Sequence, residues 1–160
     1  MKSHHFFLAA SALVLSASTL AAGSHAGGPA HNAYDTAIGK PGVASRATRT
    51  VQINMKDDMR FHADTVKAKR GETIRFVIKN SGALTHEMVL GTEKDLKDHY
   101  EVMKKNPEME HADANMITVA PGKTGEIVWQ FTKAGKVDFA CLQPGHYDAG
   151  MKGQVNVSKK

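Results

Sequence analysis

The protein is a chain of 160 residues with a formal net charge of +5, and 41% of its residues are hydrophobic, which fits one globular domain with a tail and excludes a disordered chain. A single cysteine excludes an intramolecular disulfide framework. The basic residues are scattered and only 6% of the residues are aromatic, so the sequence gives no support for nucleic-acid binding.

The first 21 residues have the pattern of a secretory signal peptide. Lys2 is the one charge before the apolar run of residues 6–20, which is too short and too rich in alanine and serine for a membrane span. Small residues at Thr19 and Ala21 favour cleavage after Ala21, and an uncleaved membrane anchor is the alternative. We therefore expect a periplasmic protein whose mature form has no membrane segment.

Residues 22–47 are rich in glycine, alanine and serine and contain few large apolar side chains. This composition predicts a flexible leader, which carries histidines at His25 and His31. The folded domain is accordingly expected over residues 48–160.

From Arg49 onward the chain has the period-two pattern of short β-strands. Apolar residues alternate with polar ones from Val51 to Met55, and residues 73–80 are mostly β-branched or aromatic. Glycine, proline and asparagine separate further short candidates, which cover residues 87–90, 115–119, 126–131, 136–141 and 154–157. Seven or eight such strands predict an all-β fold, a Greek-key β-sandwich.

One segment has a helical rather than a β pattern. Thr92 can cap a helix over residues 93–105. Leu96, Tyr100 and Met103 follow one another at helical spacing and form an apolar stripe. We expect this helical insertion to pack its stripe on the sandwich.

The segment from Cys141 to Met151 carries a thiol, an imidazole and a thioether within eleven residues, and its glycines and proline predict a loop. His146 lies between the two sulfurs, with four residues on either side. A lone thiol in an oxidising compartment is prone to oxidation, and a bond to a metal would remove the free thiol. Cysteine, two histidines and a weak axial methionine form the ligand set of a blue-copper site, so a second imidazole is needed from elsewhere.

We expect the second imidazole from His86, which opens a predicted strand after a turn. In a Greek-key sandwich that strand end can lie beside the loop after Cys141. Val137 and Phe139 share a period-two face with Cys141, so the thiol should point into the interior. His62 is the nearest rival for the second imidazole.

The spacing C-x4-H-x4-M, with Pro-Gly-His in the middle and Gly-Met at the end, resembles the ligand loop of the cupredoxins, the blue copper proteins. Within that family it is most similar to the loops of rusticyanin and of exported copper-resistance cupredoxins, and the resemblance covers residues 49–157. It implies one copper ion held by a thiolate, two imidazoles and an axial thioether, here Cys141, His86, His146 and Met151. Many cupredoxins follow the upstream histidine with an asparagine or serine that ties the two ligand loops, whereas this chain has Glu87.

Other readings of these residues stay open. A buried structural thiol is the alternative for Cys141, and a core side chain is the alternative for Met151. A cysteine near a histidine can mark a thiol nucleophile, but the nearby methionine and the lack of an evident orienting asparagine or aspartate motif argue against catalysis. Zinc is chemically feasible, although a thioether is a poor zinc ligand.

The sequence also offers a second, weaker copper site. His99 and Met103 share a helix face, and Met109 and His111 follow shortly after. The alternative is that Met103 packs in the core while the histidines are exposed. His25 could bind copper(II) if cleavage fell one residue later than expected, because the mature chain would then start Gly-Ser-His.

These observations predict an exported mononuclear copper-binding protein that is not an enzyme. It would act in copper tolerance, which the additional histidines and methionines favour, or in one-electron transfer with a redox partner protein. The alternative is a periplasmic copper(I) oxidase or an accessory subunit of a copper enzyme. Because oxygen reduction takes four electrons, an oxidase would normally need more copper centres than one.

Overall fold

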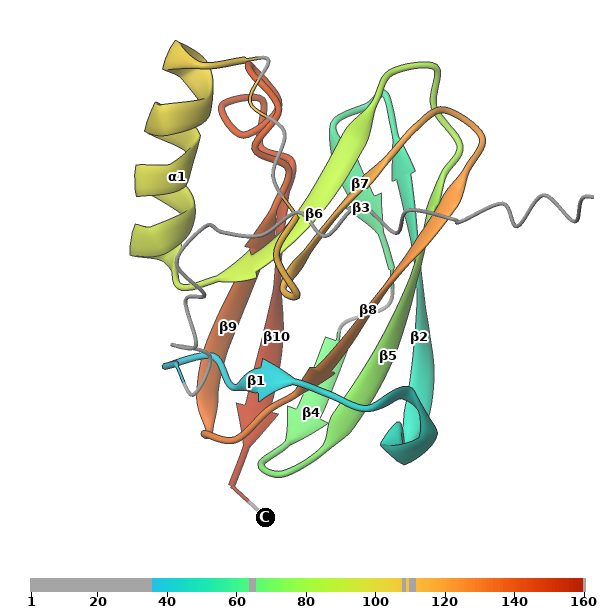
Figure 1. The fold of residues 1–160 in the computed structure, drawn as a ribbon, viewed down its shortest axis with the longest axis vertical. Coiled ribbons are helices and arrows are strands. Elements are labelled where there is room, and N and C mark those ends of the chain that lie inside the picture. The colour runs from blue at the N-terminus through green and yellow to red at the C-terminus, as the bar shows by residue number, and fades with distance from the viewer. Residues whose placement is uncertain (1–35, 64–65, 108, 110–111, 160) are drawn as a thin grey trace, which may run out of the picture. The chain divides into compact units, whose positions relative to one another are not determined.

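The computed structural model describes residues 36–63, 66–107, 109 and 112–159, which form a β-sandwich of two five-stranded sheets with one α-helix (Figure 1). The first sheet has the order β1 (Lys40–Pro41), β8 (Thr124–Gln130), β5 (Thr73–Asn80), β2 (Arg49–Lys56) and β3 (Arg60–His62). The second sheet has the order β4 (Val66–Lys69), β10 (Lys152–Ser158), β9 (Gly135–Ala140), β6 (His86–Gly91) and β7 (Met116–Val119). The predicted fold class is confirmed.

The core lies between the sheets and follows the period-two pattern. In β5, Ile74, Phe76 and Ile78 are fully buried while Arg75 and Lys79 are exposed, as alternation along a strand requires. The face shared by Val137, Phe139 and Cys141 is also in this core, which confirms the predicted direction of the thiol.

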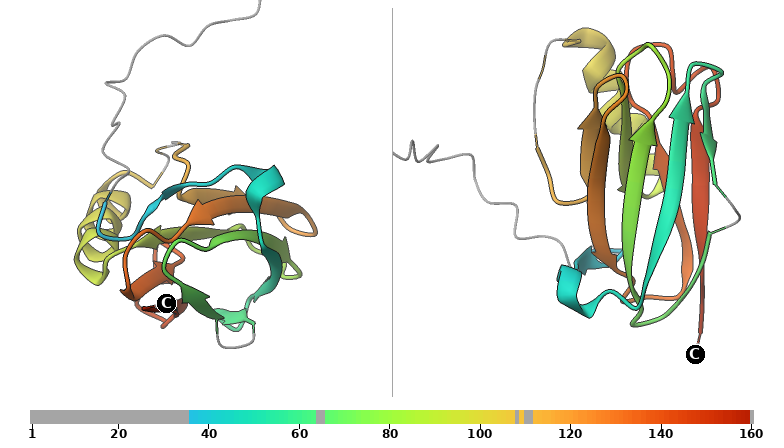
Figure 2. Two further views of the ribbon diagram at one scale, coloured as in Figure 1. Left: turned by 90° about the horizontal axis from the view of Figure 1, so that it is seen from below. Right: turned by 90° about the vertical axis from the view of Figure 1, so that its right-hand side faces the viewer.

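The helix α1 (Glu93–Lys105) has the bounds that the sequence predicts. The Thr92 hydroxyl oxygen accepts a hydrogen bond from Asp95 N at 3.1 Å and caps the first turn. Leu96, Tyr100 and Met103 are its buried residues, and they pack against β6 and β9. Seen end-on in the left view of Figure 2, α1 lies beside the sandwich. Within the described ranges no helix is both long enough and apolar enough to cross a membrane.

The structure adds β1, β3 and β4 to the predicted strands. Each has between two and four residues, too few for alternation to identify them. Pairing defines them instead. β4 pairs in parallel with β10 and β1 pairs antiparallel with β8, both far along the chain, while β3 pairs antiparallel with its neighbour β2.

Residues 36–47, the last part of the predicted flexible leader, lie against the first sheet. Ile38 is buried, and its carbonyl oxygen accepts a 2.9 Å hydrogen bond from the Trp129 indole nitrogen. This contact has no local signal in the sequence, because its two partners lie 91 positions apart. The predicted signal peptide and the rest of the leader lie outside the described residues.

Candidate metal centre

Three predicted ligands meet at one end of the second sheet. His86 is the first residue of β6, Cys141 follows β9, and His146 lies in the loop between β9 and β10, at the top of Figure 1. β6 and β9 are antiparallel neighbours with Val89 opposite Ala140, so the strand pairing itself brings the His86 and Cys141 segments together.

The three side chains point at a common centre. His146 Nδ1 lies 3.2 Å from His86 Nδ1 and 3.3 Å from Cys141 Sγ. The three ligand atoms all lie within 4.8 Å of one another, so this group could hold one metal ion. A thiolate with two imidazoles is a donor set that suits copper in both oxidation states. His86 and Cys141 are fully buried, and His146 is partly exposed.

Cys141 and His146 differ in how a metal would change their protonation. Burial raises the pKa of the Cys141 thiol to about 12, although backbone N–H groups, including that of Glu87 at 3.4 Å from Sγ, act in the other direction. Burial and the neighbouring His86 lower the pKa of His146, which favours the neutral ring that binds a metal. Metal binding must therefore displace a proton from the thiol but none from the His146 ring at neutral pH.

The ligand loop closes on itself through its backbone. Cys141 N donates to the Met151 carbonyl at 3.1 Å, and Met151 N donates to the His146 carbonyl at 3.0 Å. Gly145 and Gly150 allow these reversals with φ values of 86° and 91°, which are in the left-handed region. Met151 is fully buried in the same core cluster as Cys141. Its axial role stays a prediction.

A carboxylate that the sequence analysis missed orients His86. Asp57 Oδ1 lies 3.0 Å from His86 Nε2, which leaves Nδ1 of the ring facing the centre. Ala83 N and Leu84 N also donate to the Asp57 carboxylate, and the Ala83 bond is the main reason that the pKa of Asp57 is lowered. A Cβ on Gly82 would lie only 2.0 Å from Asp57 Oδ1, so the turn closes around this carboxylate. An aspartate in a turn is common, and the sequence holds no signal that this one reaches a histidine.

Glu87 supplies the tie between the two ligand segments. Its carboxylate, on a residue only 2% exposed, accepts a hydrogen bond from Leu142 N. The departure from the asparagine or serine of many cupredoxins therefore keeps the link and changes its chemistry to that of an acid. His62, the rival ligand, pairs instead with Asp58 at 2.7 Å on an exposed part of the surface.

The weak second copper site, which the sequence offers beside the packing of Met103, receives no support from the described residues. Met103 is buried with Leu96 and Tyr100, as the packing alternative expects, and Met109 is 43% exposed. His25 and His111 lie outside the described residues. Among the histidine, cysteine, aspartate and glutamate side chains of the described residues, one group of three could hold a metal ion, the one around Cys141.

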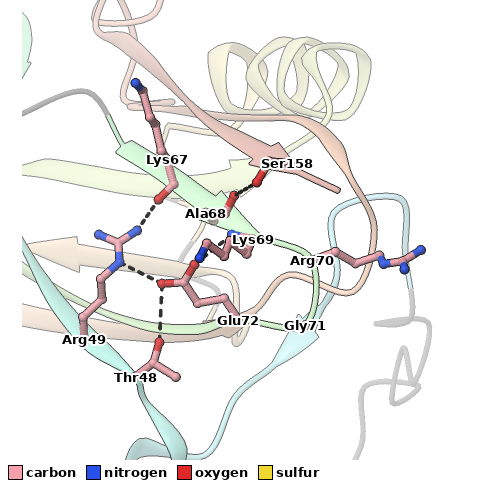
Figure 3. A pocket seen from close by; sticks show the side chains of 9 residues that line it. All are labelled: Thr48, Arg49, Lys67, Ala68, Lys69, Arg70, Gly71, Glu72 and Ser158. Carbon is pink, nitrogen blue, oxygen red and sulfur yellow. Dashed lines mark hydrogen bonds and ion pairs between the residues drawn. The ribbon is translucent and has the colours of Figure 1, made fainter. Parts of the chain in front are cut away.

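A basic groove of about 820 Å³ lies at the opposite end of the sandwich, beside the turn between β4 and β5 (Figure 3). Arg49, Lys67, Lys69 and Arg70 line it around Glu72. Glu72 pairs with Arg49 at 2.8 Å and accepts a bond from Lys69 N, while Arg70 points away from this network. The groove is thus separate from the metal-binding group.

Comparisons with known proteins agree with this geometry. The family model of copper binding proteins of the plastocyanin/azurin family matches residues 47–158. The copper-resistant cuproprotein CopI of Rubrivivax gelatinosus is 54% identical over 134 residues, 84% of this chain and 81% of the relative. CopI of Pseudomonas aeruginosa is 36% identical and covers 78% of this chain and 84% of its own length.

Solved structures of other proteins share the fold of this chain. Reduced auracyanin from Roseiflexus castenholzii is similar with a TM-score of 0.59 and 25% identity, over 70% of this chain and 98% of the other. Auracyanin B shares the fold with a TM-score of 0.61 and 21% identity. The match covers 75% of this chain and 96% of auracyanin B. From its fold, its donor set and these relatives, the chain belongs to the plastocyanin/azurin family of copper-binding proteins, the cupredoxins.

Proposed function

We propose that this protein is an exported copper protein of copper tolerance, which binds one copper ion through His86, Cys141 and His146 with Met151 as a weaker fourth ligand. The observation that carries the proposal is the convergence of one thiol and two imidazoles within 4.8 Å. The name of the relatives, copper-resistant cuproprotein, supports the role in tolerance.

When bound, copper supplies one-electron exchange between its two oxidation states. The chain contributes a fixed donor set: Asp57 orients the His86 ring, and the sheet pairing holds His86 beside Cys141. Burial of these two ligands keeps water away from them. His146 is the partly exposed ligand, so its ring edge is the route by which an electron or a copper donor reaches the site.

The ligand assignment is tested with the purified protein. Copper-loaded protein should contain one copper per chain and show an intense thiolate-to-copper absorption band in the visible. Cys141→Ser should abolish the band. A band of unchanged intensity in Cys141→Ser would contradict the assignment of Cys141.

The biological role is tested with a deletion strain. Growth that fails at copper concentrations tolerated by the parent, with normal respiration, supports copper tolerance. Unchanged copper sensitivity together with impaired respiration would instead support an electron shuttle with a redox partner protein.

Export rests on the sequence of residues 1–21. Mass analysis of the secreted protein should give Ala22 as the first residue. If the protein were found in the membrane fraction with residues 1–21 still attached, export with cleavage would be contradicted.

The enzymatic alternative, a copper(I) oxidase, is less well supported. The histidine, cysteine and carboxylate side chains of the described residues form one group that could hold a metal, and one copper exchanges a single electron whereas oxygen reduction takes four. Sustained oxygen consumption by the purified protein with copper(I) as donor would favour the oxidase.

A further inference from the structure

The helical insertion packs on the ligand loop rather than only on the sheet. Its buried side chains belong to an apolar cluster separate from the main core, made of Val89, Leu96, Tyr100, Met103, Met116, Ala140, Leu142 and Tyr147. Ala140 and Leu142 flank Cys141, and Tyr147 follows His146. Figure 1 shows α1 beside the loop that joins β9 to β10. The helix thus contacts the chain on both sides of the thiol.

The hydroxyl group of Tyr100 is bonded to two points of that loop. It accepts a hydrogen bond from Gly145 N at 3.0 Å and donates one to Asp148 Oδ2 at 2.9 Å. Gly145 immediately precedes His146, and Asp148 follows two residues after it. One oxygen atom on α1 therefore spans the segment that carries the exposed ligand.

The aromatic rings reinforce this contact. The rings of Tyr100 and Tyr147 stack with centroids 4.9 Å apart at 29°, and Lys152 Nζ lies 3.6 Å from the centroid of the Tyr147 ring. The Tyr147 ring thus contacts both α1 and the first residue of β10. Packing alone would be satisfied by a phenylalanine at position 100, since the ring would remain.

The Tyr100 hydroxyl has a more specific role than packing. Tyr100 is 2% exposed, so on folding its hydroxyl group loses hydrogen bonds to water and forms hydrogen bonds to the two loop partners instead. Burial raises the pKa of Tyr100, which keeps the phenol protonated and able to donate to Asp148. A bond to Gly145 and a bond to Asp148 together fix where the backbone of His146 lies.

We propose that Tyr100 is a positioning residue for the ligand loop, and that its two hydrogen bonds set the rate at which the loop opens to take up or release copper. This inference rests on the proposed role of His146 as a copper ligand. It gives the helical insertion a function within copper handling, as a brace on the most accessible ligand.

The test compares Tyr100→Phe with Tyr147→Phe. Each variant removes one hydroxyl from the stacked pair and keeps both rings, but only Tyr100 bonds Gly145 and Asp148. Transfer of copper(I) from the loaded protein to an excess of a chelating dye should be about fivefold faster in Tyr100→Phe. Tyr147→Phe should transfer copper at the rate of the unchanged protein.

A second readout uses the copper-free protein. Hydrogen exchange at the Gly145 amide should be faster in Tyr100→Phe, while exchange at the Phe76 amide in the centre of β5 should stay unchanged and report an intact fold. This readout does not depend on the ligand assignment, whose own failure would appear in the spectrum of Cys141→Ser.

Each contrary result overturns a defined part of the inference. Unchanged exchange at Gly145 in Tyr100→Phe would overturn the brace, as would equal acceleration at Gly145 and Phe76. Faster exchange at Gly145 with unchanged copper transfer would overturn the role of the brace in copper exchange.

Discussion

Glu87 and Leu142 are joined by a hydrogen bond of 2.8 Å between the carboxylate Oε1 of the first and the backbone nitrogen of the second. In the other direction, the backbone N–H of Glu87 donates to Cys141 Sγ. Glu87, the residue after His86, thus holds both the thiol and the residue that follows it. Register alone predicts this juxtaposition, because β6 and β9 continued beyond Val89 and Ala140 place these two residues opposite each other.

Replacing Glu87 should weaken its contact with Leu142, and more so when the side chain loses its oxygen acceptor. Glu87→Ala leaves the Leu142 N–H without its acceptor, so the free energy of unfolding of the copper-free protein should fall by about 1–3 kcal/mol. Glu87→Gln keeps an oxygen acceptor and should lose less. Urea unfolding of both variants measures the difference, and equal losses would show that the hydrogen bond is not what Glu87 contributes.

Asp57→Asn should weaken copper binding without removing a ligand. The carboxylate orients the His86 ring through Nε2, and loss of such a partner typically lowers metal affinity about tenfold or more. Competition with a copper-chelating dye measures the affinity. Asp58→Asn is the matched control, because this neighbouring carboxylate pairs with the exposed His62. Equal affinities of the two variants would contradict the role of Asp57.

Met151→Leu should keep the visible band and shift its position. The substitution nearly conserves volume, so the fold should lose less than about 1.5 kcal/mol, while the axial sulfur is removed. Met103→Leu, at a buried methionine of α1, is the control and should leave the spectrum unchanged. The same spectrum in Met151→Leu as in the unchanged protein would show that Met151 is only a core residue.

Copper(II) binding should release about one proton at neutral pH. The pKa of the Cys141 thiol is raised to about 12, so the metal-free group is protonated and must lose its proton to bind as thiolate. Calorimetric titration in buffers of different ionisation enthalpy counts the protons. Binding without proton release would mean that the thiolate is already formed in the copper-free protein.

Glu72 should make the stability of the sandwich depend on acid pH. Burial pushes its pKa upward, but hydrogen bonds from Arg49 and from Lys69 N bring the pKa below its ordinary value of 4.5. A lowered pKa in the folded state means that this contribution is complete above pH 4.5 and is lost as the pH falls through the folded-state pKa.

The corresponding variant is Glu72→Gln. It should unfold more easily than the unchanged protein at pH 7, by up to about 1 kcal/mol, because the pair with Arg49 is lost. Urea unfolding at pH 7 and at pH 3 measures the two differences. A difference that does not shrink at pH 3 would show that the charge of Glu72 is not the cause.

Local patterns in the sequence predict the elements that are stabilised by residues close together in the chain. The Thr92 cap and the stripe of Leu96, Tyr100 and Met103 predict α1 with its observed bounds. Alternation predicts β2, the β-branched and aromatic run predicts β5, and the Cys-His-Met spacing predicts the loop that carries the candidate ligands. In each case the signal lies within about one turn or one strand of the residue concerned.

Contacts between distant residues leave no such trace. Asp57 reaches His86 across 29 positions, and Tyr100 reaches Gly145 across 45. A turn aspartate and a helical tyrosine have ordinary roles by default, so only the folded arrangement distinguishes these two. The short strand β4 is likewise defined by its partner β10, because four residues are too few for a pattern.

The buried indole of Trp129 gives the protein a built-in optical reporter. Trp129 is the single tryptophan of the chain and donates to the Ile38 carbonyl, and its own strand β8 pairs with β1 at the edge of the first sheet. Indole fluorescence moves to longer wavelength when the ring meets water. A red shift without loss of far-ultraviolet ellipticity would therefore signal that residues 36–41 have detached while the sandwich stays folded.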